Sequence, residues 1–204
     1  MNQRLRQLYS LPRIPLLKYK ILCSHFLSFN YAFQHGSLST SQRQSFISLI
    51  PKKNKNAEYF TNWRRVSLLN VDSKIATKTI ALRLEKILPS VLHPCQSGYV
   101  KSRFTGESIR LIADTMDFTK IENIPGIAVF LDFEKAFDSI EWDFIQKCLE
   151  SFNFGPNLRQ LVSVFYKDIS SCLNNGVASK HFYLERGVRQ GCPLSGILFV
   201  LPKV

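Results

Sequence analysis

The sequence is short of acidic residues in its first third and lacks any close pairing of cysteines. Residues 1–65 contain eleven Lys or Arg against Glu58 alone, whereas residues 66–204 contain sixteen basic and fourteen acidic residues. The five cysteines are odd in number and widely spaced, at Cys23, Cys95, Cys148, Cys172 and Cys192. Because no C-x-x-C pair occurs among them, we expect reduced thiols, no disulfides and no zinc site.

Three other absences narrow the class of protein. No apolar run approaches the length of a membrane span and no secretory signal opens the chain. We therefore expect an intracellular protein, in the nucleus or the cytoplasm, without a membrane partner. The opening is Arg-rich and free of acids, a pattern shared with mitochondrial presequences, so mitochondrial targeting stays an alternative. No G-x-x-x-x-G-K-[ST] occurs, which excludes a P-loop nucleotidase.

The charge that is present lies mainly at the start of the chain. Residues 1–65 account for +10 of the net charge of +12. A basic surface of that size suits a polyanion, and nucleic acid is the usual one. The alternative is a solvated basic tail with no partner.

Hydrophobic residues make up 45% of the chain and aromatic residues 12%, which is enough to build a core. Periodicity and turn signals predict a regular order of elements. Residues 1–22 read as an irregular basic segment or a poorly formed helix, and residues 53–65 as a polar loop. The expected helices and strands are a strand at 46–50, helices at 73–92 and 109–116, a strand at 127–131, helices at 144–152 and 158–165, a hairpin around Asn174-Asn175-Gly176, and a helix from Pro193.

The run Ile127–Leu131 ends at Asp132, and this is the first stretch that carries chemistry. An unbroken apolar run is typical of a strand covered on both faces, and the end of such a strand opens into a cleft. A carboxylate there needs solvent, a partner or a cation, and Mg²⁺ accepts one or two carboxylates together with substrate phosphates. From the run alone, two roles for Asp132 are equally supported: a metal ligand and a structural aspartate in a salt bridge.

The residues after Asp132 suggest a helix start and a packing residue. Asp138 precedes a helical run, and Glu141 lies three residues later, so we expect Asp138 to be the N-cap of a capping box. Phe137 packs in the core or floors a pocket, and the residues leave both open. Further on, Gly187 and Gly191 permit close backbone approach in the loop before the helix at Pro193.

Four stretches resemble the reverse transcriptases of non-LTR (LINE-type) retrotransposons, in the order in which that family carries them. "LDFEKAFDSIEW" resembles its first catalytic motif and "ERGVRQGCPLSGILF" its second core motif. "LIPKKNKNAEYFTNWRRVSLLN" and the helix after it resemble the fingers segment, and "QSGYVKSRF" resembles the stretch that follows the fingers.

The resemblance implies an α/β (α+β) fold, with helices packed on a small, mainly antiparallel sheet. Residues 1–22 lie outside it. Residues 23–204 are expected to form a partial reverse transcriptase domain, with fingers over about 23–120 and part of the palm over about 121–204.

The family also implies roles for individual residues. Asp132 is similar to its first catalytic aspartate, which binds two Mg²⁺ ions with the backbone carbonyl of Phe133. Phe137 matches the bulky residue that selects dNTPs. The expected dNTP-binding residues are Lys52, Arg64, Phe137, Gln190 and Gly191. The expected partners are an RNA template and a DNA primer, contacted by Lys53, Lys55, Arg65, Lys101 and Arg103.

The chain departs from the family pattern in one respect that matters for chemistry. The remaining catalytic acids of the family lie in a Tyr-x-Asp-Asp hairpin, and this sequence contains no Asp-Asp pair. Arg65 also stands where the family usually has proline. We therefore expect a truncated RNA-directed DNA polymerase domain that is inactive as an isolated chain. The alternatives are a non-catalytic nucleic-acid-binding protein and an aggregation-prone remnant with an unpaired strand edge.

Overall fold

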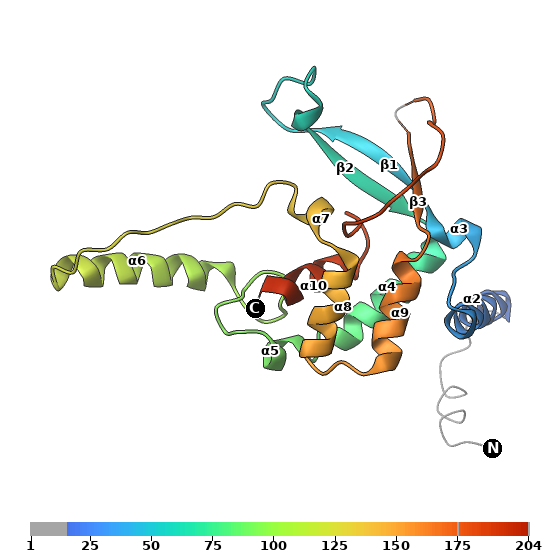
Figure 1. Ribbon diagram of the computed structural model, residues 1–204, viewed down its shortest axis with the longest axis horizontal. Coiled ribbons are helices and arrows are strands. Elements are labelled where there is room, and N and C mark those ends of the chain that lie inside the picture. Colours follow the sequence, from blue (N-terminus) through green and yellow to red (C-terminus); the bar gives the residue numbers. More distant parts are fainter. Residues whose placement is uncertain (1–15, 175, 204) are drawn as a thin grey trace.

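Figure 1 shows the computed structural model, which describes residues 16–174 and 176–203. Most of the expected irregular segment, residues 1–15, lies outside the described residues. Residues 16–22 belong to a helix, α2 (Leu16–His35), which agrees with the helical one of the two alternatives for this segment. The prolines that suggested irregularity, Pro12 and Pro15, both precede the helix, and no proline interrupts it.

The described strands form a four-stranded mixed sheet in the order β2-β1-β3-β4, which lies above the core helices in Figure 1. It comprises β1 (Gln44–Pro51), β2 (Trp63–Leu69), β3 (Ser170–Leu173) and β4 (Phe182–Tyr183). β1 pairs antiparallel with β2 and parallel with β3, and β3 pairs antiparallel with β4. The fold is thus α/β, with two of the three strand pairings antiparallel.

The expected strand at 46–50 is present, and described residues on either side of Asn175 pair antiparallel, as expected for the hairpin. β1 contains the strand, and an isolated bridge between Asn174 and Ala178 extends the β3–β4 pairing toward Gly176. β2 was not expected, because its first residues carry the charges that read as a loop. Arg64 and Leu68 lie on one face of β2 and are exposed, whereas Ser67 and Leu69 lie on the other face and are buried. Arg65 shares the face of Ser67 and Leu69 but is exposed, near the start of the strand.

Helices pack against one another to form the main core (Figure 1). They are α4 (Val71–Leu84), α5 (Leu88–Val91), α8 (Trp142–Ser151), α9 (Pro156–Tyr166) and α10 (Ser195–Val200), continued by η2 (Leu201–Lys203). The side chains buried most completely include Leu88, Ile145, Leu149, Phe165, Ile169, Leu194 and Leu198. The predicted helices at 144–152, 158–165 and after Pro193 are confirmed.

The single helix expected over 73–92 is two helices. α4 ends at Leu84, and α5 begins at Leu88. Pro89 explains the break, because it has no amide to donate and its ring would clash with the carbonyl of Glu85 in a continuous helix. Two shorter helices, α3 (Thr40–Arg43) and η1 (Phe60–Asn62), lead into β1 and β2.

Residues 104–133, which we call the arm, extend away from the core in Figure 1. The arm contains α6 (Thr105–Ile121) and an irregular return segment that leads to α7 (Ala136–Ser139). The strand expected at 127–131 is absent, because no other described strand lies beside this run to bond it. Its side chains are exposed, with Ile127 at 92% and Leu131 at 80%.

Among residues 16–174 and 176–203, none of the helices combines the length and apolar character needed to cross a bilayer. The described thiols of Cys95, Cys148, Cys172 and Cys192 are free. Burial raises the pKa of the Cys148 thiol.

Candidate functional site

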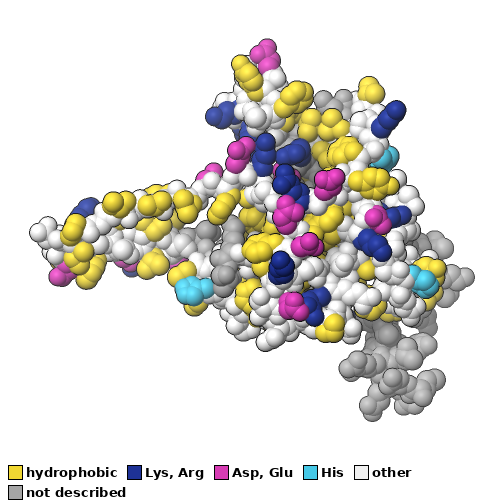
Figure 2. Space-filling view, in the orientation of Figure 1, with side chains coloured by type: hydrophobic (Ala, Val, Ile, Leu, Met, Phe, Trp, Pro, Cys, Tyr) yellow, Lys and Arg dark blue, Asp and Glu magenta, His cyan; other side chains and the backbone are white. Residues whose placement is uncertain are grey.

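A cavity of about 760 Å³ lies where the β1–β2 hairpin meets the segment around Asp132. The hairpin contributes Lys52, Arg64 and Arg65, and the segment contributes Asp132 and Phe133. Other lining residues are Leu49, Lys55, Phe60, Thr61, Asn62, Trp63, Glu134, Lys135, Asp138, Leu173 and Gln190. Figure 2 shows Lys and Arg interleaved with Asp and Glu on this face, between the hairpin and α7.

The charge lining the cavity is net positive. Five cationic side chains face three carboxylates, which leaves a formal charge of +2. The ammonium of Lys52 donates to the carbonyl oxygen of Thr61 at 2.9 Å, which holds it at the tip of the hairpin. Arg64 lies on the neighbouring strand, opposite Ile50 of β1. The fold therefore gathers cations from residues 52–65 around the segment that carries Asp132.

Arg65 and Asp138 form an ion pair across the cavity, with 2.5 Å between Nη2 and Oδ2. Asp138 was expected to cap the following helix, and that expectation is wrong. α8 begins at Trp142, its N-cap residue is Glu141, and no side-chain capping bond forms there. The carboxylate of Asp138 instead belongs to the one-turn helix α7 and is taken up by a guanidinium 73 residues earlier in the chain.

The loop 187–191 joins the two sides of the cavity through backbone bonds. The amide of Val188 donates to the carbonyl of Phe137 at 2.7 Å, and the amide of Ser67 donates to the carbonyl of Gln190 at 2.7 Å. Gly191 has φ +110°, and a Cβ on it would lie 2.6 Å from the carbonyl oxygen of Ser67. The expected close backbone approach is thus confirmed, and this glycine has no substitute that fits.

Asp132 is exposed at the cavity and forms no ion pair with any of the described residues. The structural alternative, a salt-bridged aspartate, is therefore wrong. The part of the chain that is described contains no group of three or more His, Cys, Asp or Glu placed to hold a metal ion. One free carboxylate fits Mg²⁺ that arrives with phosphate oxygens, but does not fit a metal held by protein ligands alone.

Two predicted dNTP-binding residues do not line the cavity. Phe137 is half-buried and stacks on Phe199, with ring centroids 4.5 Å apart, and meets the ring of Tyr99 edge-on. Of the two roles left open for Phe137, the structure therefore shows packing against the core. Gly191 packs closely against the backbone of Ser67 and does not line the cavity, whereas its neighbour Gln190 does.

The predicted nucleic-acid contacts fall into three groups. Lys55 and Arg65 line the cavity, whereas Lys53 and Lys101 are exposed outside it. Arg103 has a structural role, because its guanidinium donates to four backbone carbonyls in and after α5. The acceptors are those of Pro89, Leu92, His93 and Gln96, at 2.6 to 3.1 Å.

Sequence reasoning missed Glu134, Lys135 and Asp138 as lining residues. Their signal was closeness to Asp132, since all three follow it within six residues. Lys135 also has φ +48°, a left-handed turn that begins α7.

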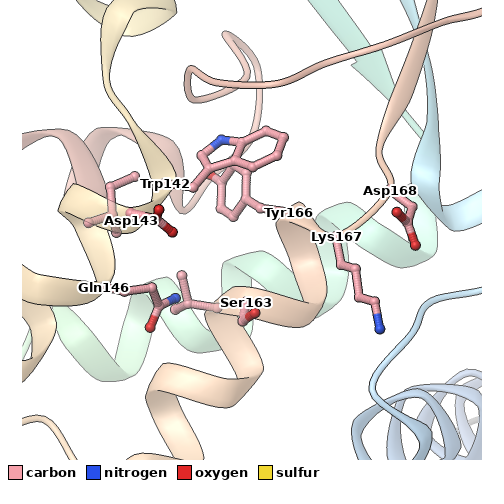
Figure 3. Close-up of a pocket in the computed structure, with 9 residues that line it drawn as sticks. Trp142, Asp143, Gln146, Ser163, Tyr166, Lys167 and Asp168 are labelled. Atoms are coloured by element: carbon pink, nitrogen blue, oxygen red, sulfur yellow. The ribbon is translucent and has the colours of Figure 1, made fainter.

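A second, smaller cavity of about 320 Å³ lies beside α8 and α9 (Figure 3). The rings of Trp142 and Tyr166 lie close together on one side of it, with Asp143 and Gln146 on α8. Tyr166 is buried, which raises the pKa of its phenol above the usual range, with a smaller contribution from Cys192. None of the residues expected to act on a substrate lines this cavity.

The profile of the reverse transcriptase (RNA-dependent DNA polymerase) family matches residues 50–202, which include both sides of the larger cavity. This chain belongs to the reverse transcriptase family. It is 37% identical over 171 residues to the transposon TX1 uncharacterized 149 kDa protein of Xenopus laevis, a match that covers 83% of this chain and 13% of that protein.

A second relative of this reverse transcriptase is the retrovirus-related Pol polyprotein from the type-1 retrotransposable element R2 of Popillia japonica. The identity is 30% over 168 residues, covering 80% of this chain and 23% of the polyprotein. The R2DM Pol polyprotein of Drosophila melanogaster is 27% identical, over 81% of this chain and 16% of the polyprotein. The reverse transcriptase chain thus spans less than a quarter of each relative, and the resemblance to non-LTR retrotransposon proteins is confirmed.

Proposed function

We propose that the larger cavity binds the triphosphate of a dNTP together with Mg²⁺, as the nucleotide site of an RNA-directed DNA polymerase domain. The observation that carries the proposal is the convergence of five cationic side chains on one exposed, unpaired carboxylate. A formal charge of +2 complements a Mg²⁺–triphosphate, which carries about two negative charges. Lys52 supplies a compact charge and Arg64 a bidentate fork for phosphate oxygens.

Asp132 is the residue that would hold the metal side of this ligand, with the backbone carbonyl of Phe133 as the second donor. When bound, Mg²⁺ would neutralise negative charge on the phosphate oxygens next to the carboxylate. The side chains themselves bind and orient: Lys52 and Arg64 hold the phosphates from the hairpin side. Gln190 approaches from the loop that is bonded to β2.

The activity that we propose for this chain alone is binding without sustained synthesis. Polymerases in the family position attacking and leaving oxygens between two metal ions, which requires several carboxylates. Among the described residues that line the cavity, one carboxylate is free, since Asp138 is paired with Arg65 and Glu134 with Lys135. An RNA template and a DNA primer are the partners that we propose for the domain.

The test compares two neighbouring lysines. Lys52 lines the cavity and Lys53 does not, so Lys52→Ala should weaken binding of Mg²⁺–dATP about tenfold, whereas Lys53→Ala should leave it unchanged. Isothermal titration calorimetry of the full chain measures both. Equal effects of the two substitutions, or no binding by the unaltered chain, would reject the nucleotide site.

A separate assay addresses synthesis. Primer extension with Mg²⁺, dNTPs and an RNA template should give no product above background with this chain alone. Robust product that disappears in the Asp132→Ala variant would show that one carboxylate suffices, and would overturn the proposal of binding without synthesis.

A second candidate function, nucleic-acid binding without catalysis, is favoured by the loop before β2. Tyr59 and Phe60 are exposed there, at 63% and 88%, beside Lys53 and Lys55. Exposed aromatic rings next to cations stack on unpaired bases. This function predicts RNA binding that weakens steeply with salt, that falls in the Phe60→Ala variant and that is unchanged in Asp132→Ala. Filter binding at two salt concentrations measures all three.

A further inference from the structure

Arg189 is the one charged side chain that is buried in the described part of the chain, with 4% of its surface exposed. It takes part in none of the ion pairs formed by residues that the structure describes. Its Nε and Nη1 atoms are buried and have no hydrogen-bond partner among those residues. Because arginine stays protonated, a full positive charge lies in the core without a carboxylate beside it. An apolar side chain of similar size usually serves stability as well or better, so stability alone does not explain this arginine.

The guanidinium of Arg189 is held at the carboxyl end of α9. Its Nη2 donates to the carbonyl oxygen of Phe165 at 3.3 Å. Phe165 lies in the last turn of α9, where carbonyl oxygens lack a helical partner and carry the negative end of the helix dipole. The guanidinium carbon also lies 5.9 Å from the centroid of the Tyr166 ring, within the range of a cation–π contact. These contacts favour a cation at this place over a neutral side chain.

The residues on either side of Arg189 connect this anchor to the larger cavity. The carbonyl of Gly187 accepts from the indole of Trp142 at 2.8 Å. Trp142 and Tyr166, whose rings lie close together in Figure 3, therefore each contact one residue of the loop 187–191. Gln190 follows Arg189 directly and lines the cavity. The loop is thus anchored in the core by the residue that immediately precedes the one at the cavity.

We propose that Arg189 is a positioning residue, whose buried charge fixes the loop 187–191 so that Gln190 is held at the cavity. The contacts of Arg189 have a preferred direction, whereas an apolar side chain would fill the same space without one. The cost of burying the charge is then offset by a fixed loop. The consequence for nucleotide binding rests on the proposed function, which places Gln190 at the dNTP.

The first experiment observes the loop without any nucleotide. The amide of Ser67 donates to the carbonyl of Gln190 at 2.7 Å, so its hydrogen exchange, resolved by NMR, reports the position of the loop. Arg189→Met keeps the length of the side chain and removes its charge, and should speed this exchange at least about tenfold. The amide of Leu198 in α10 should change less than about twofold. Arg189→Lys should stay close to the unaltered chain, because an ammonium can also bind a single carbonyl and a ring.

The second experiment asks whether Arg189 acts through Gln190. In calorimetric titrations with Mg²⁺–dATP, Gln190→Ala should weaken binding about fivefold and Arg189→Met about threefold. Arg189→Met added to Gln190→Ala should weaken it by less than about 1.5-fold more, since the side chain to be positioned is already gone. Arg159→Met is the matched control, because Arg159 also lies on α9 but pairs with Glu150 at 2.6 Å, away from the cavity. It should change neither binding nor the exchange of Ser67.

The two experiments separate this inference from the proposed function. If the unaltered chain binds no Mg²⁺–dATP while Arg189→Met still speeds the exchange of Ser67, the nucleotide site is rejected and the positioning of the loop stands. Unchanged exchange at Ser67, an equal rise at Ser67 and Leu198, or equal effects of Arg189→Met and Arg189→Lys would each overturn the inference. So would additive losses of affinity at Arg189 and Gln190.

Discussion

The ion pair between Arg65 and Asp138 gives the sharpest prediction for the site. It joins β2 to α7, and both elements also bond to the loop 187–191, so it closes a ring of three segments around the cavity. The side chains are 47% and 34% exposed, so solvent screens the pair and its coupling should be about 0.5–1 kcal/mol. Arg65→Gln and Asp138→Asn should each lower the free energy of unfolding by about 1 kcal/mol.

The same two substitutions should have opposite effects on ligand binding. Asp138→Asn removes a carboxylate and raises the formal charge lining the cavity from +2 to +3, so dATP with Mg²⁺ should bind about fivefold more tightly. Arg65→Gln lowers that charge to +1 and should weaken binding by a similar factor. Asp138→Asn is then a variant that is less stable and binds better, which loss of folding alone cannot produce.

The assay is a double-mutant cycle in urea, with calorimetric titration of Mg²⁺–dATP on each variant. The control pair is Arg110–Asp114 on α6, which is 3.7 Å long, highly exposed and one turn apart, and which should show coupling below about 0.3 kcal/mol. Additive effects at Arg65 and Asp138, or weaker binding by Asp138→Asn, would refute the reasoning.

Three further predictions concern residues that hold the framework. Gly191→Ala should lower the free energy of unfolding by more than about 2 kcal/mol in a urea titration, because its Cβ would clash with the Ser67 carbonyl, while Gly126→Ala, with open space around it, should change it by less than about 0.5 kcal/mol. Because its pKa is raised, Tyr166 favours the folded state below the unfolded pKa near about 10, and stability falls as pH rises beyond that value. Urea titrations from pH 9 to 11 should show that Tyr166→Phe loses less stability than the unaltered chain; parallel slopes would contradict this. Arg103→Lys should cost about 2 kcal/mol, because a lysine cannot serve four carbonyls, and should leave RNA affinity of the folded protein unchanged in filter binding.

Local patterns predicted the elements whose stability comes from their own sequence and near neighbours. α8 and α9 were predicted because apolar residues recur at helical spacing on both sides of Phe154-Gly155-Pro156, which breaks the pattern. The hairpin was found because Asn-Gly accepts its turn. β2 was missed because it begins with the charged pair Arg64-Arg65, which is typical of a loop, and its strand structure depends on pairing with β1.

The candidate site is formed by contacts between residues that are far apart in the sequence, and local sequence patterns do not reveal such contacts. Asp138 satisfied the spacing of a capping box, yet its carboxylate binds Arg65, and a partner so distant in sequence leaves no mark on neighbouring residues. Arg103 carried a charge that suited nucleic acid, yet it caps the end of α5. In both cases a polar side chain took the tertiary partner that satisfies most of its bonds.

The run before Asp132 shows why one apolar pattern can predict composition and still fail to predict structure. Ile127 to Leu131 has the residues of a buried strand, but strand formation also requires a second strand to accept its backbone bonds. Among the described residues none does so, and the run is exposed. The composition of the run therefore predicted a strand, whereas its exposure follows from the lack of a pairing strand among the described residues.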